Sequence, residues 1–248
     1  MSVRRYNAIF LSPHLDDAVL SAGNQLQLYT EQGKAVLVVT IFTKGSESRH
    51  PAAVSFLRQS GYSHANQLFA HRKKEDIAAL RLLGADHLHL PYIDAGFRTE
   101  HPTTEHIFKS SSTQSDRQLV TSIHLRLSKI MTQYAADDCH VFGPLAVGNH
   151  IDHEIVYEAA RKTWDPSQHW QLSFWEDVPY RHRTGETCTR LAQVSTTIQG
   201  MRRETVFTRS SKLKQAAIFC YSSQFSGLIN RGGYCQTYDN QIESYWHA

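Results

Sequence analysis

Residues 6–17 read Tyr-Asn-Ala-Ile-Phe-Leu-Ser-Pro-His-Leu-Asp-Asp, an apolar run that passes through a proline into a cluster of polar side chains. The apolar part predicts a buried strand over residues 6–11, which Pro13 must end because proline cannot donate a hydrogen bond within a sheet. Beyond the turn, four apolar residues recur at helical spacing: Val19, Ala22, Leu26 and Tyr29. A second apolar strand is expected over residues 35–42. The chain therefore begins as strand, helix and strand, with polar residues 14–17 in the first turn.

The same alternation continues along the chain. Apolar periodicity predicts further elements, namely helices over 65–83, 119–130 and 151–164, and strands over 88–90, 140–142 and 171–175. This order predicts an α/β protein with a Rossmann-like three-layer fold, in which a mostly parallel sheet is flanked by helices. We expect one domain over residues 1–248. The pattern is weaker over 178–248, where we expect an extended segment at 191–198 and a helix at 211–221.

The composition is that of an ordinary globular protein, with 41% hydrophobic and 20% charged residues and a formal net charge of +3. So small and dispersed an excess of basic residues predicts no nucleic-acid partner. The apolar run at 35–42 is much shorter than the roughly 20 residues of a membrane helix, and the N-terminus lacks the long apolar region of a signal peptide. We therefore expect a cytoplasmic protein with no membrane partner, and the sequence leaves a homo-oligomer open. The four cysteines form no C-x-x-C pair, which argues against a thiolate zinc site and a disulfide framework.

Two polar clusters follow predicted strands, one at residues 13–17 and one at residues 148–153. Ligands of an open parallel sheet bind just past the carboxyl ends of its strands, which is where both clusters fall. Together they offer three imidazoles and three carboxylates. His14 and Asp17 are three residues apart across a turn that enters a helix, so their side chains can point to the same side, and His150 and His153 have the same spacing. Two nitrogens and one oxygen from this set would make a three-ligand zinc site with an open position for water. Either cluster alone would be explained as a helix cap or a solvated turn, but two such clusters at strand ends favour the metal site.

The two clusters contain the sequences Pro13-His14-Leu15-Asp16-Asp17 and His150-Ile151-Asp152-His153. These resemble the P-H-x-D-D and H-x-D-H motifs of the PIG-L or LmbE-like family of zinc-dependent N-deacetylases. Further positions are similar to family features between the motifs: Arg72, Glu75, Ala79 and Leu83-Gly84 on one helix, and Asp94 after the third strand. The resemblance covers roughly the first 165 residues and extends faintly to residues 221–224. Ala18 departs from it, because the family commonly has Glu there, which would support the metal site.

The resemblance implies a zinc ion with three protein ligands, His14, Asp17 and His153; another divalent transition metal would also fit them. It implies that Asp16 is the general base for a metal-bound water that attacks an N-acyl carbonyl. It also implies that a charged His150, held by Asp152, is the electrophilic partner. The expected reaction removes an N-acyl group, acetyl in the first instance, from an N-acetylglucosamine-type sugar or glycoconjugate.

Arg72 lies on the apolar stripe of the predicted 65–83 helix, where an unpaired charge would be expensive. Its guanidinium either binds sugar hydroxyls or a phosphate of the substrate, or forms an internal ion pair with Asp76 or Asp94. We assign Arg72 and Asp94 as substrate-binding residues.

Other polar segments carry weaker signals. Residues 98–115 predict a long surface loop, a candidate lid, in which His101 and His106 are solvated. Four residues after the last predicted strand form either a sugar-stacking wall or core: Trp175, Glu176, Asp177 and Tyr180. Five basic residues are expected on a solvated face: Arg202, Arg203, Arg209, Lys212 and Lys214.

Two other functions compete with the deacetylase. A metal-dependent phosphoesterase also uses His and Asp clusters on a parallel sheet, although it usually needs more carboxylates or two metals. A non-catalytic sugar-binding protein on the same fold would explain Ala18 as decay. The retention of Asp16 beside intact metal ligands argues against that reading.

Overall fold

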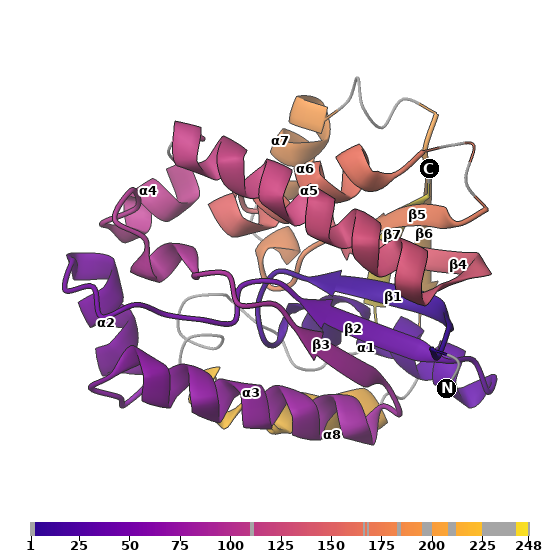
Figure 1. Ribbon diagram of the computed structural model, residues 1–248, viewed down its shortest axis with the longest axis horizontal. Helices are drawn as coiled ribbons and strands as arrows, with labels where there is room; N and C mark the ends of the chain where they lie inside the picture. Colours follow the sequence, from indigo (N-terminus) through magenta and orange to yellow (C-terminus); the bar gives the residue numbers. More distant parts are fainter. Residues whose placement is uncertain are drawn as a thin grey trace.

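The computed structural model describes residues 3–109, 112–165, 167, 169–182, 185–194, 200–207, 212–224 and 242–247. Within these residues, seven strands form one sheet in the order β3-β2-β1-β4-β5-β7-β6 (Figure 1). The strands are β1 (Tyr6–Ser12), β2 (Val36–Thr40), β3 (Asp86–His89), β4 (Ala135–Pro144), β5 (Gln171–Trp175), β6 (Arg202–Phe207) and β7 (Ile242–His247).

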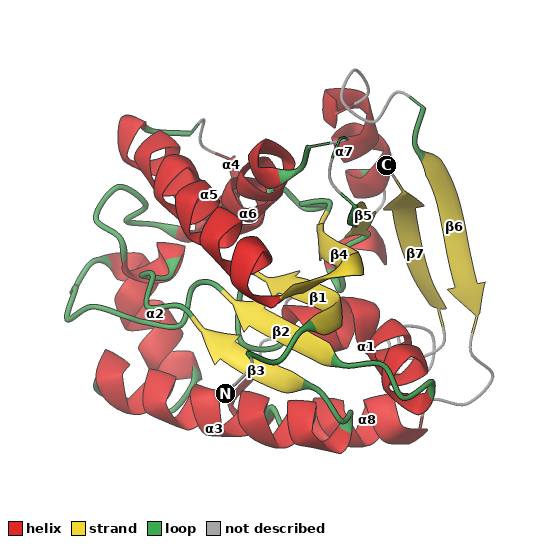
Figure 2. Ribbon diagram, turned by 45° about the vertical axis from the view of Figure 1, so that its right-hand side comes forward, coloured by secondary structure: helices red, strands yellow, loops and turns green. Residues whose placement is uncertain are grey.

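Helices connect the strands and cover the sheet. They are α1 (Asp17–Glu31), α2 (Pro51–Gln59), α3 (Ala65–Leu82), α4 (Thr104–Lys109), α5 (Gln114–Tyr134), α6 (Ile151–Thr163), α7 (Glu186–Val194) and α8 (Lys212–Phe219). Three short 3-10 helices accompany them, η1 (Ala95–Phe97), η2 (Tyr180–His182) and η3 (Ser222–Gln224). Figure 2 shows α5 and α6 on one face of the sheet and α3 and α8 on the other. The predicted three-layer α/β fold is confirmed.

Strands β1 to β5 run parallel, and β7 runs antiparallel to both β5 and β6. The chain winds outward from β1 through β2 to β3, and then returns to place β4 on the other side of β1. The order therefore reverses between β1 and β4, and such a switch point is where an open α/β sheet binds ligands.

Alternation along β1 explains why helices cover both faces. Ile9 and Leu11 pack in a core cluster with residues of α5 and α6, whereas Ala8 and Phe10 pack in a second cluster with residues of α1, α3 and α8. Successive side chains of a strand point to opposite faces, so a strand that is apolar at every position needs cover on both sides. Each large side chain buried in this way contributes about 1.5–3 kcal/mol.

The C-terminal part of the chain differs from the prediction. The segment at 191–198 was expected to be extended, but residues up to Val194 belong to α7, and residues 195–198 lie outside the described residues. Helical spacing puts both Leu191 and Val194 against the core, which a short apolar run could not reveal. The helix expected at 211–221 is confirmed as α8. Strand β7 enters the sheet between β5 and β6 although it comes last in the sequence.

Lys214 does not lie on a solvated face. It is fully buried, and its Nζ lies 2.8 Å from Glu243 Oε1. The same carboxylate accepts hydrogen bonds from the amides of Asn24 and Gln25, where α1 departs from helical geometry at Ala22. The prediction of a solvated Lys214 was wrong because a local cluster of basic residues in the sequence does not reveal a partner such as Glu243 that is distant along the chain. Three of the other basic residues are exposed as expected: Arg202, Arg203 and Lys212. Arg209 lies outside the described residues.

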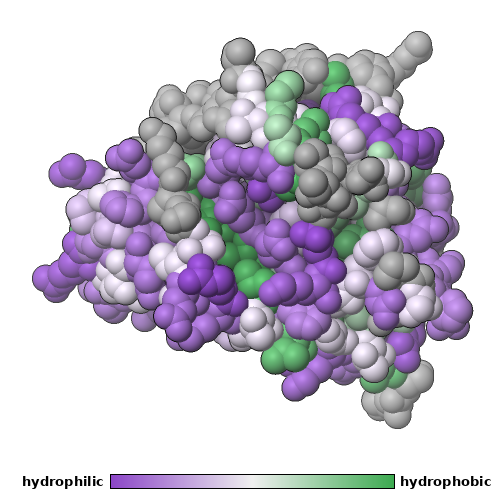
Figure 3. All heavy atoms as spheres, turned by 90° about the horizontal axis from the view of Figure 1, so that it is seen from above, coloured by the Kyte–Doolittle hydropathy of each residue, from purple (hydrophilic) through white to green (hydrophobic). Residues whose placement is uncertain are grey.

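The surface drawn in Figure 3 is mostly hydrophilic. On this face, hydrophobic atoms show in the hollow near the centre and in small groups near the edges. Within the described ranges, no helix combines the length and the apolar character needed to cross a membrane. Cys139, Cys188 and Cys220 are free thiols, and Cys235 lies outside the described residues.

His140 predicts a stability that depends on pH. Burial, with contributions from His247 and Lys34, lowers the pKa of His140 from 6.5 to about 4. Between these values the unfolded chain binds a proton at this imidazole and the folded chain does not, so the free energy of unfolding falls as the pH drops, by up to about 3 kcal/mol. Urea unfolding at neutral pH and near pH 4 should show this fall. It should be smaller in His140→Gln and unchanged in a control at the exposed His169, His169→Gln; an equal fall in His140→Gln would refute the assignment.

Candidate active site

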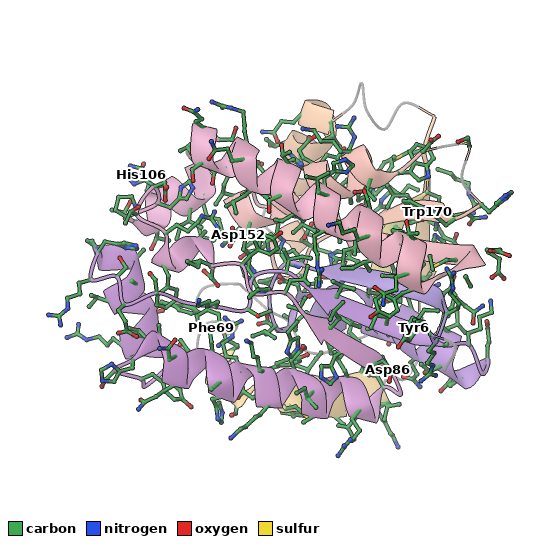
Figure 4. The ribbon with its side chains drawn as sticks, viewed as in Figure 1. Tyr6, Phe69, Asp86, His106, Asp152 and Trp170 are labelled. Carbon is green, nitrogen blue, oxygen red and sulfur yellow. The ribbon has the colours of Figure 1, made fainter. Side chains whose placement is uncertain are left out.

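The turns that follow β1 and β4 meet at one edge of the sheet. The two strands are neighbours, with Phe10 opposite Phe142. The turns bring three imidazole rings to centroid separations of 4.9, 5.1 and 5.3 Å, those of His14, His150 and His153. Figure 4 shows Asp152 near the arrowheads of the strands, far from Tyr6 and Asp86 at the opposite end. Parallel pairing has therefore joined two clusters that lie far apart in the sequence.

Ser12 closes the first turn. Its hydroxyl donates to the carbonyl of His14 at 2.6 Å and accepts from the amide of Ala18 at 3.0 Å. The amide of His14 donates to Asp17 Oδ2 at 2.8 Å. These bonds direct the side chains of His14 and Asp17 to the same side, as their spacing predicted. Ala18 itself packs in an apolar cluster, so the carboxylates that support the site come from other positions.

The second turn depends on left-handed backbone. Ala146, Gly148 and Asn149 have φ values of 65°, 91° and 55°. A Cβ on Gly148 would lie 2.5 Å from Cγ of Tyr180, so only glycine leaves room for that ring. The turn ends at His150, whose Nδ1 accepts from the amide of Asp152 at 3.2 Å and caps α6.

His14 lies between two carboxylates. Its Nδ1 is 3.1 Å from Asp17 Oδ2, and its Nε2 is 3.0 Å from Asp152 Oδ2. Burial opposes protonation of this ring, but Asp94, Asp152 and Asp17 together raise the pKa of His14 well above its usual value. A cation that took the place of the Nδ1 proton would satisfy the same carboxylate of Asp17.

His153 has the complementary arrangement. Its Nδ1 lies 2.7 Å from Asp177 Oδ1, and its Nε2 lies 3.3 Å from Asp17 Oδ2. Burial opposes protonation, but Asp17 and Asp177 raise the pKa of His153 to about 9. Asp177 therefore orients this imidazole. It was expected in a sugar-stacking wall or the core; its position directly after β5 was the signal for a site residue.

The donor atoms of three of these residues lie within 4.8 Å of one another, those of His14, Asp17 and His153. Nitrogen, oxygen and nitrogen suit a divalent transition metal, and each imidazole has its other nitrogen on a buried carboxylate, as metal-ligating histidines usually do. The residues therefore fit a divalent metal. A second set meets the same distance criterion and shares one member with the first: His14, His150 and Asp152.

Asp152 was expected to hold the ring of His150 and keep it charged. The structure differs, because the carboxylate of Asp152 accepts from His14, from the amide of Ala95 at 2.8 Å and from Arg98 Nη1 at 2.6 Å. Burial, His14 and His153 lower the pKa of His150 well below its usual value, so this ring is neutral. Since its Nδ1 accepts a hydrogen bond, the proton is on Nε2, and His150 lines the cavity as a neutral donor.

Asp16 and Arg72 face each other at the cavity. Arg72 Nη2 lies 3.5 Å from Asp16 Oδ1, and Arg72 Nη1 lies 3.9 Å from Asp94 Oδ2. The expected internal ion pair with Asp94 is present, and the second carboxylate beside Arg72 is that of Asp16 rather than that of Asp76. The guanidinium also lines the cavity, so it remains accessible to a substrate. Burial raises the pKa of Asp16 to about 6 against the opposing effect of Arg72. Asp94 lines the cavity too, and its carboxylate accepts from the amide of Gly96.

A cavity of about 580 Å³ opens above these residues. Its walls combine apolar and polar side chains from α2, α4, residues 178–180 and η3, including Phe56, Gln59, Phe108, Tyr180 and Gln224. Of the residues expected as wall or core, Tyr180 lines the cavity, whereas Trp175 is fully buried in the core.

Residues 98–115 are not a plain surface loop. They contain α4 and the start of α5, and Ser110 and Ser111 lie outside the described residues. His106 is exposed as predicted, but His101 is fully buried, with Nε2 at 3.1 Å from both carboxylate oxygens of Asp116. Arg98 is buried as well, and its Nη1 donates a hydrogen bond to Asp152 Oδ1. The sequence around Arg98 gave no indication of this contact.

A sequence model of the PIG-L family, described as GlcNAc-PI de-N-acetylase, matches residues 9–164. The chain belongs to the PIG-L family. Both motif turns lie inside the matched segment, so the predicted family is confirmed.

Two relatives of this PIG-L protein are named as deacetylases. It is 31% identical over 179 residues to 2'-N-acetylparomamine deacetylase of Streptomyces fradiae, a match that covers 72% of this chain and 59% of the relative. It is 26% identical over 267 residues to 2'-N-acetylparomamine deacetylase of Niallia circulans, covering 96% and 89% of the two chains.

Two solved deacetylase structures are similar to this chain over nearly their whole length. A deacetylase–bog complex from the biosynthesis pathway of teicoplanin has a TM-score of 0.76 at 25% identity and covers 97% of this chain and 96% of that one. The zinc-inhibited form of teicoplanin deacetylase has a TM-score of 0.73 at 25% identity, with 97% of each chain covered.

Gly148→Ala should damage the second turn. The new Cβ is strained at φ 91° and collides with Tyr180, so we expect a loss of about 2–4 kcal/mol in the free energy of unfolding. Gly200→Ala is the matched control, because Gly200 also has φ 91° but nothing within 4 Å of its Cβ position. Urea unfolding should give a smaller loss for the control. The excess should vanish when Tyr180 is first replaced by Gly, because both Cβ and Cγ of Tyr180 lie within 2.6 Å of the new Cβ; an excess that persists there would show that the collision is not its cause.

Proposed function

We propose that this chain is a divalent-metal-dependent N-deacetylase, with zinc as its resident ion, that removes an N-acetyl or other N-acyl group from an amino sugar or its conjugate. The observation that carries the proposal is the convergence of His14, Asp17 and His153 donor atoms within 4.8 Å, beside Asp16, at a cavity of about 580 Å³. The names of the relatives support the same reaction and an amino-sugar substrate. The expectations of a single domain, a cytoplasmic location and an open oligomeric state remain predictions.

His14, Asp17 and His153 would hold the metal, with Asp152 and Asp177 behind the two imidazoles. A divalent cation bound there would supply a Lewis acid that lowers the pKa of water from 15.7 to about 7. The set of two nitrogens and one oxygen favours zinc over a hard cation that prefers oxygen ligands alone.

Asp16 is suited to be the general base. Its carboxylate lines the cavity next to the metal ligands, and a pKa of about 6 keeps it ionised near neutral pH while leaving it basic enough to accept a proton from water. Arg72 lies beside Asp16 and limits how far burial can raise this pKa.

His150 is suited to stabilise the acyl oxygen when negative charge develops on it. The ring lines the cavity and carries its proton on Nε2, so a neutral imidazole can donate without being charged. Such a donor is worth about 3–4 kcal/mol in the barrier of an acyl transfer. Arg72 and Asp94 line the same cavity and would bind sugar hydroxyls. The guanidinium of Arg72 and the carboxylate of Asp94, which would make these contacts, also lie next to each other.

The buried carboxylates also weigh against a phosphoesterase. That chemistry commonly uses a second metal with its own carboxylates. Here Asp152 is paired with Arg98 and Asp177 with His153, so neither is available to a second ion without losing a buried partner.

Two variants test the assigned roles. Asp16→Ala removes the base but no metal ligand, so amine release from N-acetylglucosamine conjugates should fall by about 10²- to 10⁴-fold while the zinc content stays near that of the wild type. His153→Ala should lose the zinc as well as the activity. Metal analysis of protein purified without chelator gives the zinc content, and Asp165→Asn, at an exposed carboxylate, is the control. Equal metal loss in both variants would contradict the roles, and phosphate release from a generic ester would support the phosphoesterase.

A further inference from the structure

Two overlapping sets of metal donors share His14. The first set adds Asp17 and His153, and the second adds His150 and Asp152. The imidazole of His14 contacts Asp17 through Nδ1 and Asp152 through Nε2, so its two nitrogens face different sets. Something in the structure must therefore decide which of the two nitrogens is available to a metal.

Asp152 is already occupied by hydrogen-bond donors. Its Oδ2 accepts from His14 Nε2 at 3.0 Å and from the amide of Ala95 at 2.8 Å, and its Oδ1 accepts from Arg98 Nη1 at 2.6 Å. The side chain of Asp152 is fully buried and that of Arg98 is 7% exposed, so the pair is little screened by water. A carboxylate so neutralised is a poor ligand for a second cation.

Arg98 is itself held in place from several sides. Its Nη1 also donates to the carbonyl of Ile93 at 2.9 Å, and its Nη2 lies 3.4 Å from Asp116 Oδ1. The guanidinium lies over the ring of Phe42 at 5.4 Å from the centroid. Asp116 is fixed in turn by the amide and hydroxyl of Thr113. The position of the positive charge is therefore set by the fold rather than by the metal site.

The orientation of His14 follows from this arrangement. Its Nε2 is hydrogen-bonded to Asp152, and Asp152 is held in turn by Arg98 and by the amide of Ala95. The ring is therefore turned so that Nδ1 faces Asp17 and His153.

We propose that Arg98 is a positioning residue that, through Asp152, fixes His14 so that the metal is bound by His14, Asp17 and His153 and not by the overlapping set with His150. This inference rests on the proposed function, because it concerns the same metal site. Arg98 touches neither the metal position nor the substrate in this scheme; it neutralises Asp152 and leaves it as a hydrogen-bond acceptor for His14.

The test is a double-mutant cycle on zinc affinity, measured by competition with a chromophoric chelator. Asp152→Asn should weaken zinc binding by about 10- to 100-fold, as loss of a carboxylate behind a metal-bound histidine usually does. Arg98→Met should weaken it as well. The double variant should bind no more weakly than Asp152→Asn alone, because Arg98 acts through Asp152. It also removes both charges of the buried pair, which favours folding over either single change. Independent, multiplying losses would overturn the proposal.

His150 provides a second readout. In the wild type His150 is not a ligand, so His150→Ala should leave zinc affinity unchanged. In the Arg98→Met background Asp152 is free to bind a cation, so His150→Ala should reduce the affinity. A cobalt-loaded Arg98→Met protein should accordingly show an altered visible absorption spectrum. If Arg98→Met keeps the wild-type affinity and spectrum and stays insensitive to His150→Ala, Arg98 does not select the site.

Lys214→Met is the matched control. It also leaves a buried carboxylate, that of Glu243, without its cation, but neither residue lines the cavity or belongs to a metal-donor set. It should lower the urea midpoint and leave zinc affinity unchanged; a comparable loss of zinc affinity would mean that general destabilisation explains Arg98→Met. If Arg98→Met does not fold, Arg98→Gln takes its place in the cycle, because it removes the charge but keeps a hydrogen-bond donor. It should weaken zinc binding on its own and add no loss to Asp152→Asn; an Arg98→Gln protein with wild-type affinity would overturn the proposal. A wild-type chain that binds no zinc would contradict the proposed function instead.

Discussion

Parallel pairing of β1 with β4 places the carboxyl ends of both strands side by side, and the candidate active site exists only because of that pairing. Neither turn has a complete set of ligands. The turn after β1 supplies His14, Asp16 and Asp17, and the turn into α6 supplies His150 and His153. The apolar side chains of β1 on both faces hold the strand in the middle of the sheet, so packing energy fixes the separation of the polar groups. The site is thereby assembled by the core before any ligand binds.

The charges at the site are balanced in pairs. Buried carboxylates are costly unless each has a cation or a hydrogen-bond donor. Arg98 serves Asp152, His153 serves Asp177, and Arg72 lies beside Asp16. Asp17 instead faces two imidazoles whose pKa values it raises, so without a metal these rings are protonated. A divalent cation would replace those protons on the inner nitrogens and leave the outer hydrogen bonds to Asp152 and Asp177 intact.

The sequence was informative where chemistry depends on neighbours in the chain. The spacing of His14 and Asp17 predicted side chains on one side of a turn, and the alternation of strands and helices predicted the sheet. It was uninformative where a partner is distant. Arg98 looked like the start of a solvated loop and Lys214 like part of a basic surface, yet both are buried in ion pairs with Asp152 and Glu243. Local patterns carry no information about such partners, because pairing is decided by how helices and loops pack.

Part of the cavity wall comes from a different segment of the chain than the metal donors at its base. The residues with chemical roles lie within the segment matched by the PIG-L family, residues 9–164, except Asp177. Tyr180 and Gln224 lie beyond that segment, and they line the cavity beside residues of α2 and α4. Gln224 is brought there by η3, whose serines donate to the buried carboxylate of Glu75 on α3. Because part of the enclosure lies outside the segment that supplies the metal donors, its shape can change without moving those donors. The C-terminal part therefore contributes to the shape of the cavity although it supplies none of the donors in the two metal sets.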